Sequence, residues 1–206
     1  MKHLLLLMPL LACLAACQSS PTTPSAAPTA AKPAQAPAEP AAAAPGKPEY
    51  IEDNMLTVNG QPVKELTTAQ LQRQLGRPDS IAKGVVECGA MLDALNKMNS
   101  PAGDFWYYGH TRYEVSGTHA ILASFDVTTG KFQGKLGSLM LNQNTTLEDV
   151  RRLFPKSAKQ ADVPSTVRPG EEMSLPFYYK GKQMDESLIL LFKKGRLQEV
   201  EFFMPC

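Results

Sequence analysis

The sequence predicts an α+β fold made of two degenerate helix-plus-antiparallel-sheet repeats, which follow a cleaved N-terminal signal and a disordered Pro/Ala linker. Three observations support this prediction. A short Thr-capped helix that ends at a proline occurs twice, over 66–78 and 144–155. An aromatic strand follows later in each half, and a hairpin follows each aromatic strand. A recurring order of elements indicates an internal repeat, although a single α+β domain with chance similarity would contain the same elements.

The first 16 residues have the features of a secretory signal. Lys2 and His3 precede an apolar run over 4–14, which is shorter than the roughly 20 residues that span a bilayer. The run ends in Leu14-Ala15-Ala16-Cys17, and this tetrapeptide resembles the lipobox of bacterial lipoproteins. The resemblance implies cleavage before Cys17 and lipidation of that residue, which would anchor the chain to a membrane.

Residues 17–49 are predicted to be a lipidated tether. Gln18, rather than Asp, follows the cysteine, and by the same resemblance this indicates the outer membrane, with the chain facing the periplasm. The segment consists mainly of Pro, Ala, Ser and Thr, so it buries too little apolar surface to offset the entropy of ordering. It is therefore expected to be a solvated spacer rather than a Pro-x-x-P ligand, with a stretched reach of roughly 100 Å.

The first repeat is predicted over residues 50–138. A strand over 55–58 runs into the Asn59-Gly60 turn, and a helix with Leu71 and Leu75 on one face follows. A second helix over 84–100 is predicted from apolar side chains that recur every three or four residues. Residues rich in aromatic and β-branched side chains then predict four strands, over 105–109, 112–116, 120–127 and 131–136.

The second repeat is predicted over residues 139–206. Its helix covers 144–155, with Thr145 or Thr146 at the start and Pro155 at the end. An aromatic strand over 174–181 and a hairpin over 187–203, which turns at Lys194-Gly195, complete the repeat.

Cysteine and histidine positions bear on disulfide and metal chemistry. Cys13 leaves with the signal and Cys17 is lipidated, so Cys88 and Cys206 remain in an oxidising compartment and are predicted to form a disulfide. Such a bond would stabilise the domain by roughly 4–5 kcal/mol in the chain-entropy model. His110 and His119 have no cysteine or carboxylate cluster at zinc spacing, so neither a metal nor another cofactor is predicted.

Part of the first repeat resembles a known family. The residues that carry the resemblance are Leu66-Thr67-Thr68 with Leu71, the helix end over 75–78, the strand Trp106-Tyr107-Tyr108, and Phe125-Asp126. They are similar to the BamE (SmpA/OmlA) family of outer-membrane lipoproteins and to its wider fold group, which includes the tandem-repeat β-lactamase inhibitor proteins. The chain departs from the family pattern in its extra residues before Asp104. The resemblance implies the fold, and the partner of that family is the β-barrel assembly machinery.

Composition and motifs argue against two functional classes. The net charge is only +1 and no long basic run occurs, so nucleic acid is not an expected partner. The nucleophile–base candidates are Ser116 or Ser124 with His110 or His119, but no Gly-x-Ser-x-Gly elbow is present. The chain is therefore predicted not to be an enzyme.

A non-catalytic protein-binding module of the cell envelope, acting in its assembly or maintenance, is the favoured prediction. Aromatic residues are enriched in binding hot spots, and Phe105, Tyr107 and Tyr178 are the candidate binding residues for another envelope protein. Because side chains alternate along a strand, Trp106 is expected to face the core while Phe105 or Tyr107 points away. The alternatives are an inhibitor of a secreted or periplasmic hydrolase and, less favoured, an envelope enzyme.

Overall fold

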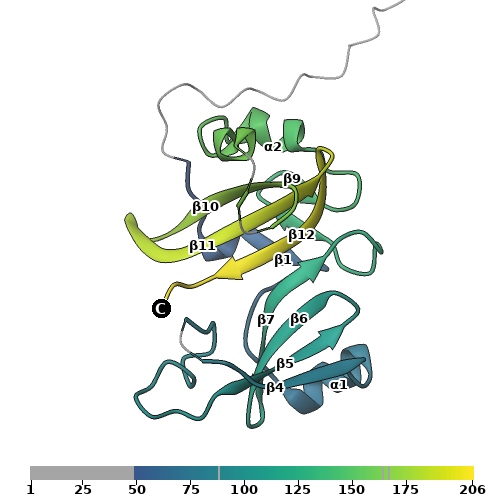
Figure 1. The fold of residues 1–206 in the computed structure, drawn as a ribbon, viewed down its shortest axis with the longest axis vertical. Coiled ribbons are helices and arrows are strands. Elements are labelled where there is room, and N and C mark those ends of the chain that lie inside the picture. The colour runs from purple at the N-terminus through teal and green to yellow at the C-terminus, as the bar shows by residue number, and fades with distance from the viewer. Residues whose placement is uncertain (1–48, 88, 164, 167) are drawn as a thin grey trace, which may run out of the picture. The chain divides into compact units, whose positions relative to one another are not determined.

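The computed structural model of the chain describes residues 49–87, 89–163, 165–166 and 168–206 (Figure 1). The predicted signal over 1–16, the lipidation site Cys17, the tether up to residue 48 and Cys88 lie outside the described residues. None of the helices in the described part is long and apolar enough to cross a bilayer.

The prediction of an α+β fold of helix-plus-sheet repeats is wrong, because the chain is mainly antiparallel β-sheet. Strands contain 46% and helices 15% of the described residues. The two α-helices, α1 (Thr68–Leu75) and α2 (Leu147–Leu153), have only two turns each. Such short helices cannot form a separate layer, and strands from both predicted repeats instead join in one continuous sheet.

The large sheet has the strand order β10-β11-β12-β7-β6-β5-β4 (Figure 1). Its strands are β4 (Ser80–Val86), β5 (Gly103–Tyr108), β6 (Thr111–Ser116), β7 (His119–Asp126), β10 (Glu171–Tyr179), β11 (Lys182–Lys193) and β12 (Arg196–Phe203). The short strand β3 (Leu66–Thr67) pairs with the start of β7, while β12 pairs with its end. Strand β7 therefore connects the two halves of the chain.

A bulge in the β6–β7 pairing changes the direction of side chains along β7. Arg112 pairs with Ser124, whereas the adjacent Tyr113 pairs with Leu122. Because of the extra residue, Leu122 and Phe125, which are three positions apart, both belong to the larger cluster of buried apolar side chains, called the main core below. Ser124 is left on the opposite face, beside Arg112.

A second sheet has four strands, two of which come from the segment before α1. It consists of β2 (Gln61–Pro62), β1 (Leu56–Val58), β8 (Gly134–Leu136) and β9 (Leu139–Leu141) in that order. Asn59 and Gly60 connect β1 to β2 with positive φ angles of 50° and 76°, as a tight Asn-Gly turn requires. The side chains of Leu56, Leu136 and Leu141 are buried in the main core.

Both α-helices begin with a capping box. The Thr67 hydroxyl accepts a hydrogen bond from the Gln70 N–H, and the Gln70 side chain accepts one from the Thr67 N–H. Thr146 and Asp149 form the same arrangement at α2. Helix α1 ends at Gly76, which has a φ of 84° that favours glycine. The 3-10 helices η1 (Asp53–Met55) and η2 (Ser157–Asp162) complete the helical segments.

The predicted helix over 84–100 is also wrong. Residues 80–86 form strand β4, and the described residues that follow form an irregular loop in which Gly89 has a φ of 70°. Ala90, Leu92 and Leu95 of this loop form a second apolar cluster with Val86 of β4. The buried Glu114 carboxylate fixes it by accepting hydrogen bonds from the N–H groups of Met91 (2.7 Å) and Leu92 (3.1 Å). Local turn geometry and this carboxylate therefore replace helical hydrogen bonds.

The start of the described chain is attached to the edge of the large sheet. Ile51 forms a parallel bridge with Phe177, and its carbonyl accepts a hydrogen bond from the Tyr178 N–H (2.8 Å). The Glu49 carboxylate accepts a hydrogen bond from the Ser157 N–H (2.7 Å) at the start of η2. The last residue of the predicted tether, Glu49, is thus bonded to the folded part of the chain.

The C-terminal residue Cys206 is disulfide-bonded. The backbone of the last three residues lies against Gly89. A Cβ atom placed on this glycine would be 2.4 Å from the Met204 carbonyl oxygen and 3.2 Å from the Cys206 nitrogen. The identity of the partner as Cys88 stays a prediction, since Cys88 lies outside the described residues.

Candidate binding face

Two of the three predicted binding residues lie on the same face of strand β5. Phe105 packs against the second apolar cluster, whereas Trp106, the next residue, packs against the main core. The rings of Phe105 and Tyr107 meet edge to face, with centroids 6.3 Å apart. All three side chains are half-buried. The alternation along β5 thus leaves Phe105 and Tyr107 as a partly exposed aromatic pair.

Arg112 on β6 lies beside this aromatic pair. Its guanidinium carbon is 5.4 Å from the centre of the Phe105 ring, within the range of a cation–π interaction. Its Nε donates a hydrogen bond to the Ser124 hydroxyl (2.9 Å). Its Nη2 lies 2.9 Å from Glu201 Oε1 and 3.4 Å from Glu199 Oε1. Phe105, Tyr107, Arg112, Glu199 and Glu201 form a surface, named the Arg112 face below, and the buried Ser124 lies beneath it.

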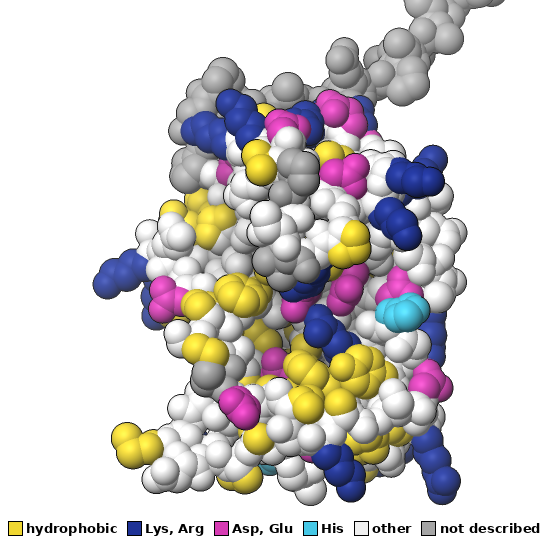
Figure 2. All heavy atoms as spheres, in the orientation of Figure 1, with side chains coloured by type: hydrophobic (Ala, Val, Ile, Leu, Met, Phe, Trp, Pro, Cys, Tyr) yellow, Lys and Arg dark blue, Asp and Glu magenta, His cyan; other side chains and the backbone are white. Residues whose placement is uncertain are grey.

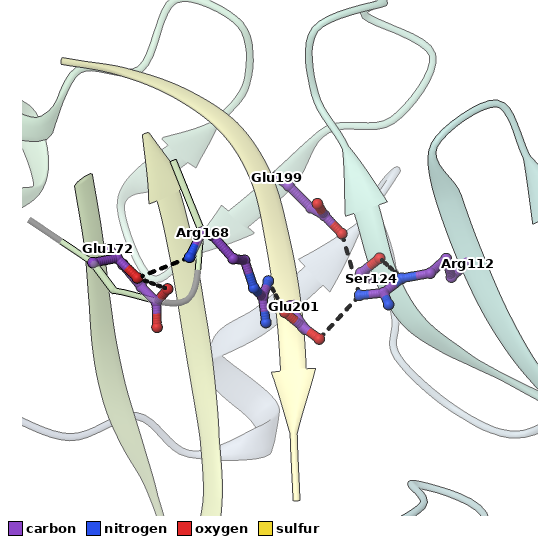
Figure 3. A network of polar contacts seen from close by, with 7 residues as sticks. Arg112, Ser124, Arg168, Glu172, Glu199 and Glu201 are labelled. Atoms are coloured by element: carbon purple, nitrogen blue, oxygen red, sulfur yellow. Dashed lines mark hydrogen bonds and ion pairs between the residues drawn. The ribbon is translucent and has the colours of Figure 1, made fainter. Parts of the chain in front are cut away.

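The polar contacts continue across the sheet (Figure 3). Arg168, in the loop before β10, forms an ion pair with the second oxygen of Glu201 and donates its backbone N–H to the Ser165 hydroxyl (3.2 Å). That hydroxyl donates in turn to Glu172 (3.3 Å). Burial lowers the pKa of the Arg168 guanidinium, but the hydrogen bond and charge of Glu201 more than compensate, so the pKa is raised. Glu201 therefore connects two permanently charged arginines.

Apolar and charged side chains are adjacent on this side of the molecule. Figure 2 shows hydrophobic side chains gathered over the lower part of the large sheet, with basic and acidic side chains directly above them. Aromatic residues and arginine are the types enriched in the centres of protein interfaces. Because Glu199 and Glu201 hold the Arg112 side chain, a partner would meet it already oriented.

Tyr178, the third predicted binding residue, lies elsewhere. Its ring stacks on Tyr50 with centroids 4.5 Å apart, and its hydroxyl donates to the Gln183 side chain (3.3 Å). Tyr178 therefore holds the start of the described chain on the sheet edge. The structure does not bring it together with Phe105 and Tyr107.

Of the four serine and histidine candidates for catalysis, Ser124 and His119 have other partners, and Ser116 lies half-buried at the end of β6. The Ser124 hydroxyl accepts from Arg112. His119 pairs with Glu65 through Nδ1, and both of these side chains are about half exposed. His110 is exposed in the turn between β5 and β6. In the described residues no three His, Cys, Asp or Glu side chains are grouped closely enough to hold a metal ion.

The charged part of the Arg112 face was not predicted from the sequence. The alternating pair Glu199 and Glu201 was visible in the sequence, and it indicated two carboxylates on one face of a strand. The position of Arg112 opposite them was not visible, because it depends on the pairing of β12 with β7.

Comparisons of the chain with protein-family models, curated protein sequences and solved structures gave no match. The resemblance of the first half to the BamE family therefore stays a prediction from the sequence.

Proposed function

We propose that this chain is a non-catalytic protein-binding module, anchored to the bacterial outer membrane through Cys17 and facing the periplasm, which contacts another envelope protein through the Arg112 face. The observation that carries the proposal is the pairing of Phe105 and Tyr107 beside an arginine whose guanidinium is already oriented. An aromatic pair supplies apolar contact area with little loss of side-chain entropy, and the arginine supplies specificity.

The environment of the candidate catalytic residues also supports a binding role. A serine nucleophile needs a base within hydrogen-bonding distance. Ser124 is bound to Arg112, which is a permanent cation and cannot accept a proton. The Ser124 hydroxyl therefore orients the Arg112 side chain by accepting its hydrogen bond.

The experiment is a comparison of alanine variants in partner capture. Affinity-tagged full-length protein is purified from envelope fractions, and the captured proteins are quantified by mass spectrometry. The double variant Phe105→Ala/Tyr107→Ala should lose at least tenfold of a specific partner, since each hot-spot side chain contributes about 1–2 kcal/mol or more.

Tyr178→Ala is the matched control, because it also removes a half-buried tyrosine from the sheet but lies outside the Arg112 face. Equal capture by wild type, the double variant and the control would refute the proposal. If the captured protein is a hydrolase whose activity falls on binding, the inhibitor function is the correct form of the proposal.

A further inference from the structure

A cavity of about 300 Å³ lies between α1, the segment 58–66 and strands β6 and β7. It is named the α1 cavity here. Its inner wall is formed by Val58, Tyr113, Leu122 and Phe132, which are at most 9% exposed. Half-buried Val63, Leu66 and Leu75 line its sides. The exposed residues at its mouth are polar, apart from one proline: Asn59, Gln61, Pro62, Lys64, Gln70 and Gln74.

The Tyr113 hydroxyl is an unused hydrogen-bond donor in this cavity. The residue is 7% exposed, and its ring packs edge to face on Tyr108 at 5.8 Å. The Tyr108 hydroxyl donates to the Gly76 carbonyl (3.2 Å), whereas the Tyr113 hydroxyl has no hydrogen-bond partner within the described part of the chain. Among the described residues it is not one of the fully buried side-chain atoms that lack a partner, so the hydroxyl has access to solvent. A ligand in the cavity can replace that solvent as the acceptor.

The Tyr113 hydroxyl is protonated at neutral pH, as a hydrogen-bond donor must be. Burial, and to a lesser extent the neighbouring Tyr108, raises the pKa of Tyr113 to about 12. The hydroxyl therefore keeps its proton at neutral pH and can donate to an anion.

The charge of the lining favours an anionic ligand. Lys64 is the one charged residue among those that line the α1 cavity, and it forms no ion pair with the described residues. The Gln70 oxygen already accepts from the Thr67 N–H, so its amide NH₂ remains to face a ligand. Gln74 offers a second amide. The mouth thus combines a positive charge with N–H donors and lacks a carboxylate.

We infer that the α1 cavity binds an unbranched aliphatic carboxylic acid of about ten carbon atoms. The size follows from the volume, because a water molecule takes up about 30 Å³ of liquid and a methylene group is of similar size. The chain lies against Val58, Leu122 and Phe132, and the carboxylate accepts from Tyr113 and faces Lys64. Tyr113 alternates with Arg112 on β6, so this site is on the opposite face from the proposed protein-binding surface and does not depend on it.

The test is a titration of the chain without its predicted signal, residues 17–206, in which Cys17→Ser removes the lipid acceptor and all other residues of this range are kept. Decanoate, methyl decanoate and decyltrimethylammonium are compared by calorimetry and by amide chemical shifts. Decanoate should bind best, with shifts at Tyr113, Leu122 and Leu75. Methyl decanoate represents an esterified acyl chain, and tighter binding of the ester than of the acid would overturn the free-acid assignment.

Two variants and a control locate the site. Tyr113→Phe keeps the ring and should weaken decanoate binding about tenfold, since it removes one hydrogen bond to a charged group. Lys64→Gln should remove the preference for decanoate over decyltrimethylammonium. Lys182→Gln, at an exposed lysine remote from the cavity lining, should leave binding unchanged. Absence of decanoate binding to the folded wild type, or equal affinity in wild type and Tyr113→Phe, would refute the inference.

Discussion

Replacing Glu201 by Gln tests whether the polar contacts of the Arg112 face hold the two halves of the sheet together. The Glu201 side chain is only 13% exposed, and its two oxygens pair with Arg112 and Arg168. These arginines come from β6 and from the loop before β10, while Glu201 belongs to β12. Glutamine keeps the size of the side chain but removes the charge from both contacts.

The expected loss is about 3 kcal/mol. A hydrogen bond to a charged group contributes about 1.5–3 kcal/mol and a neutral one about 0.5–1.5 kcal/mol. The arginine that meets the glutamine oxygen therefore loses about 1 kcal/mol, whereas the arginine that meets the glutamine NH₂, which can only donate, loses its hydrogen bond, at about 2 kcal/mol. Glu199→Gln is the matched control, because Glu199 faces the same arginine from the same strand but is 26% exposed and lies 3.4 Å from it. Its replacement should cost about 0.5 kcal/mol or less.

Urea unfolding at pH 7, followed by circular dichroism, measures both free energies. The urea midpoint of Glu201→Gln should fall by about 1.5 M relative to wild type, and that of Glu199→Gln by about 0.2–0.3 M. Equal midpoints for the two variants would refute the reasoning, because distance and burial would then not decide which carboxylate stabilises the sheet.

Three further predictions concern single sites. Burial raises the pKa of the Glu114 carboxyl above its ordinary value, so the stability that protonated Glu114 contributes at low pH is lost as the pH rises through the folded-state pKa. Glu114→Gln should remove this decline from the pH profile of the unfolding free energy. An unchanged profile would contradict this assignment. Thr146→Ala removes the cap that bonds to Asp149 and should lower the unfolding free energy by about 1 kcal/mol, whereas no change in thermal melting would count against the cap. Thiol labelling of the native, unreduced protein should modify neither Cys88 nor Cys206, and labelling of both would disprove their pairing.

Local elements were predictable from the sequence where a short-range signal decides the structure. The sequence predicted Thr67 or Thr68 as the cap of α1 and Gly76 with Pro78 as its end, and in the structure Thr67 and Gly76 bound the helix. The aromatic and β-branched run gave β5 within two residues of its predicted bounds. These signals act over three or four residues, so no long-range contact was needed to interpret them.

The fold class and the charged part of the Arg112 face depend on long-range contacts. The apolar spacing over 84–100 suited a helix, but a buried carboxylate from β6, Glu114, and the left-handed backbone at Gly89 hold this segment as a loop. The pairing of β12 with β7 joins residues 75 positions apart at Val200↔Phe125 and creates one sheet where two repeats were predicted. No local pattern specified that pairing.

Photocrosslinking in intact cells tests the protein-binding function most directly. A photoreactive amino acid is placed at Tyr107 of the full-length chain, and in a separate strain at Tyr178 as the control. The proposal predicts one specific adduct with an envelope protein from position 107 that is absent from position 178 and is lost when Phe105→Ala is added. Absence of any adduct from position 107, or the same adducts from both positions, would contradict the account.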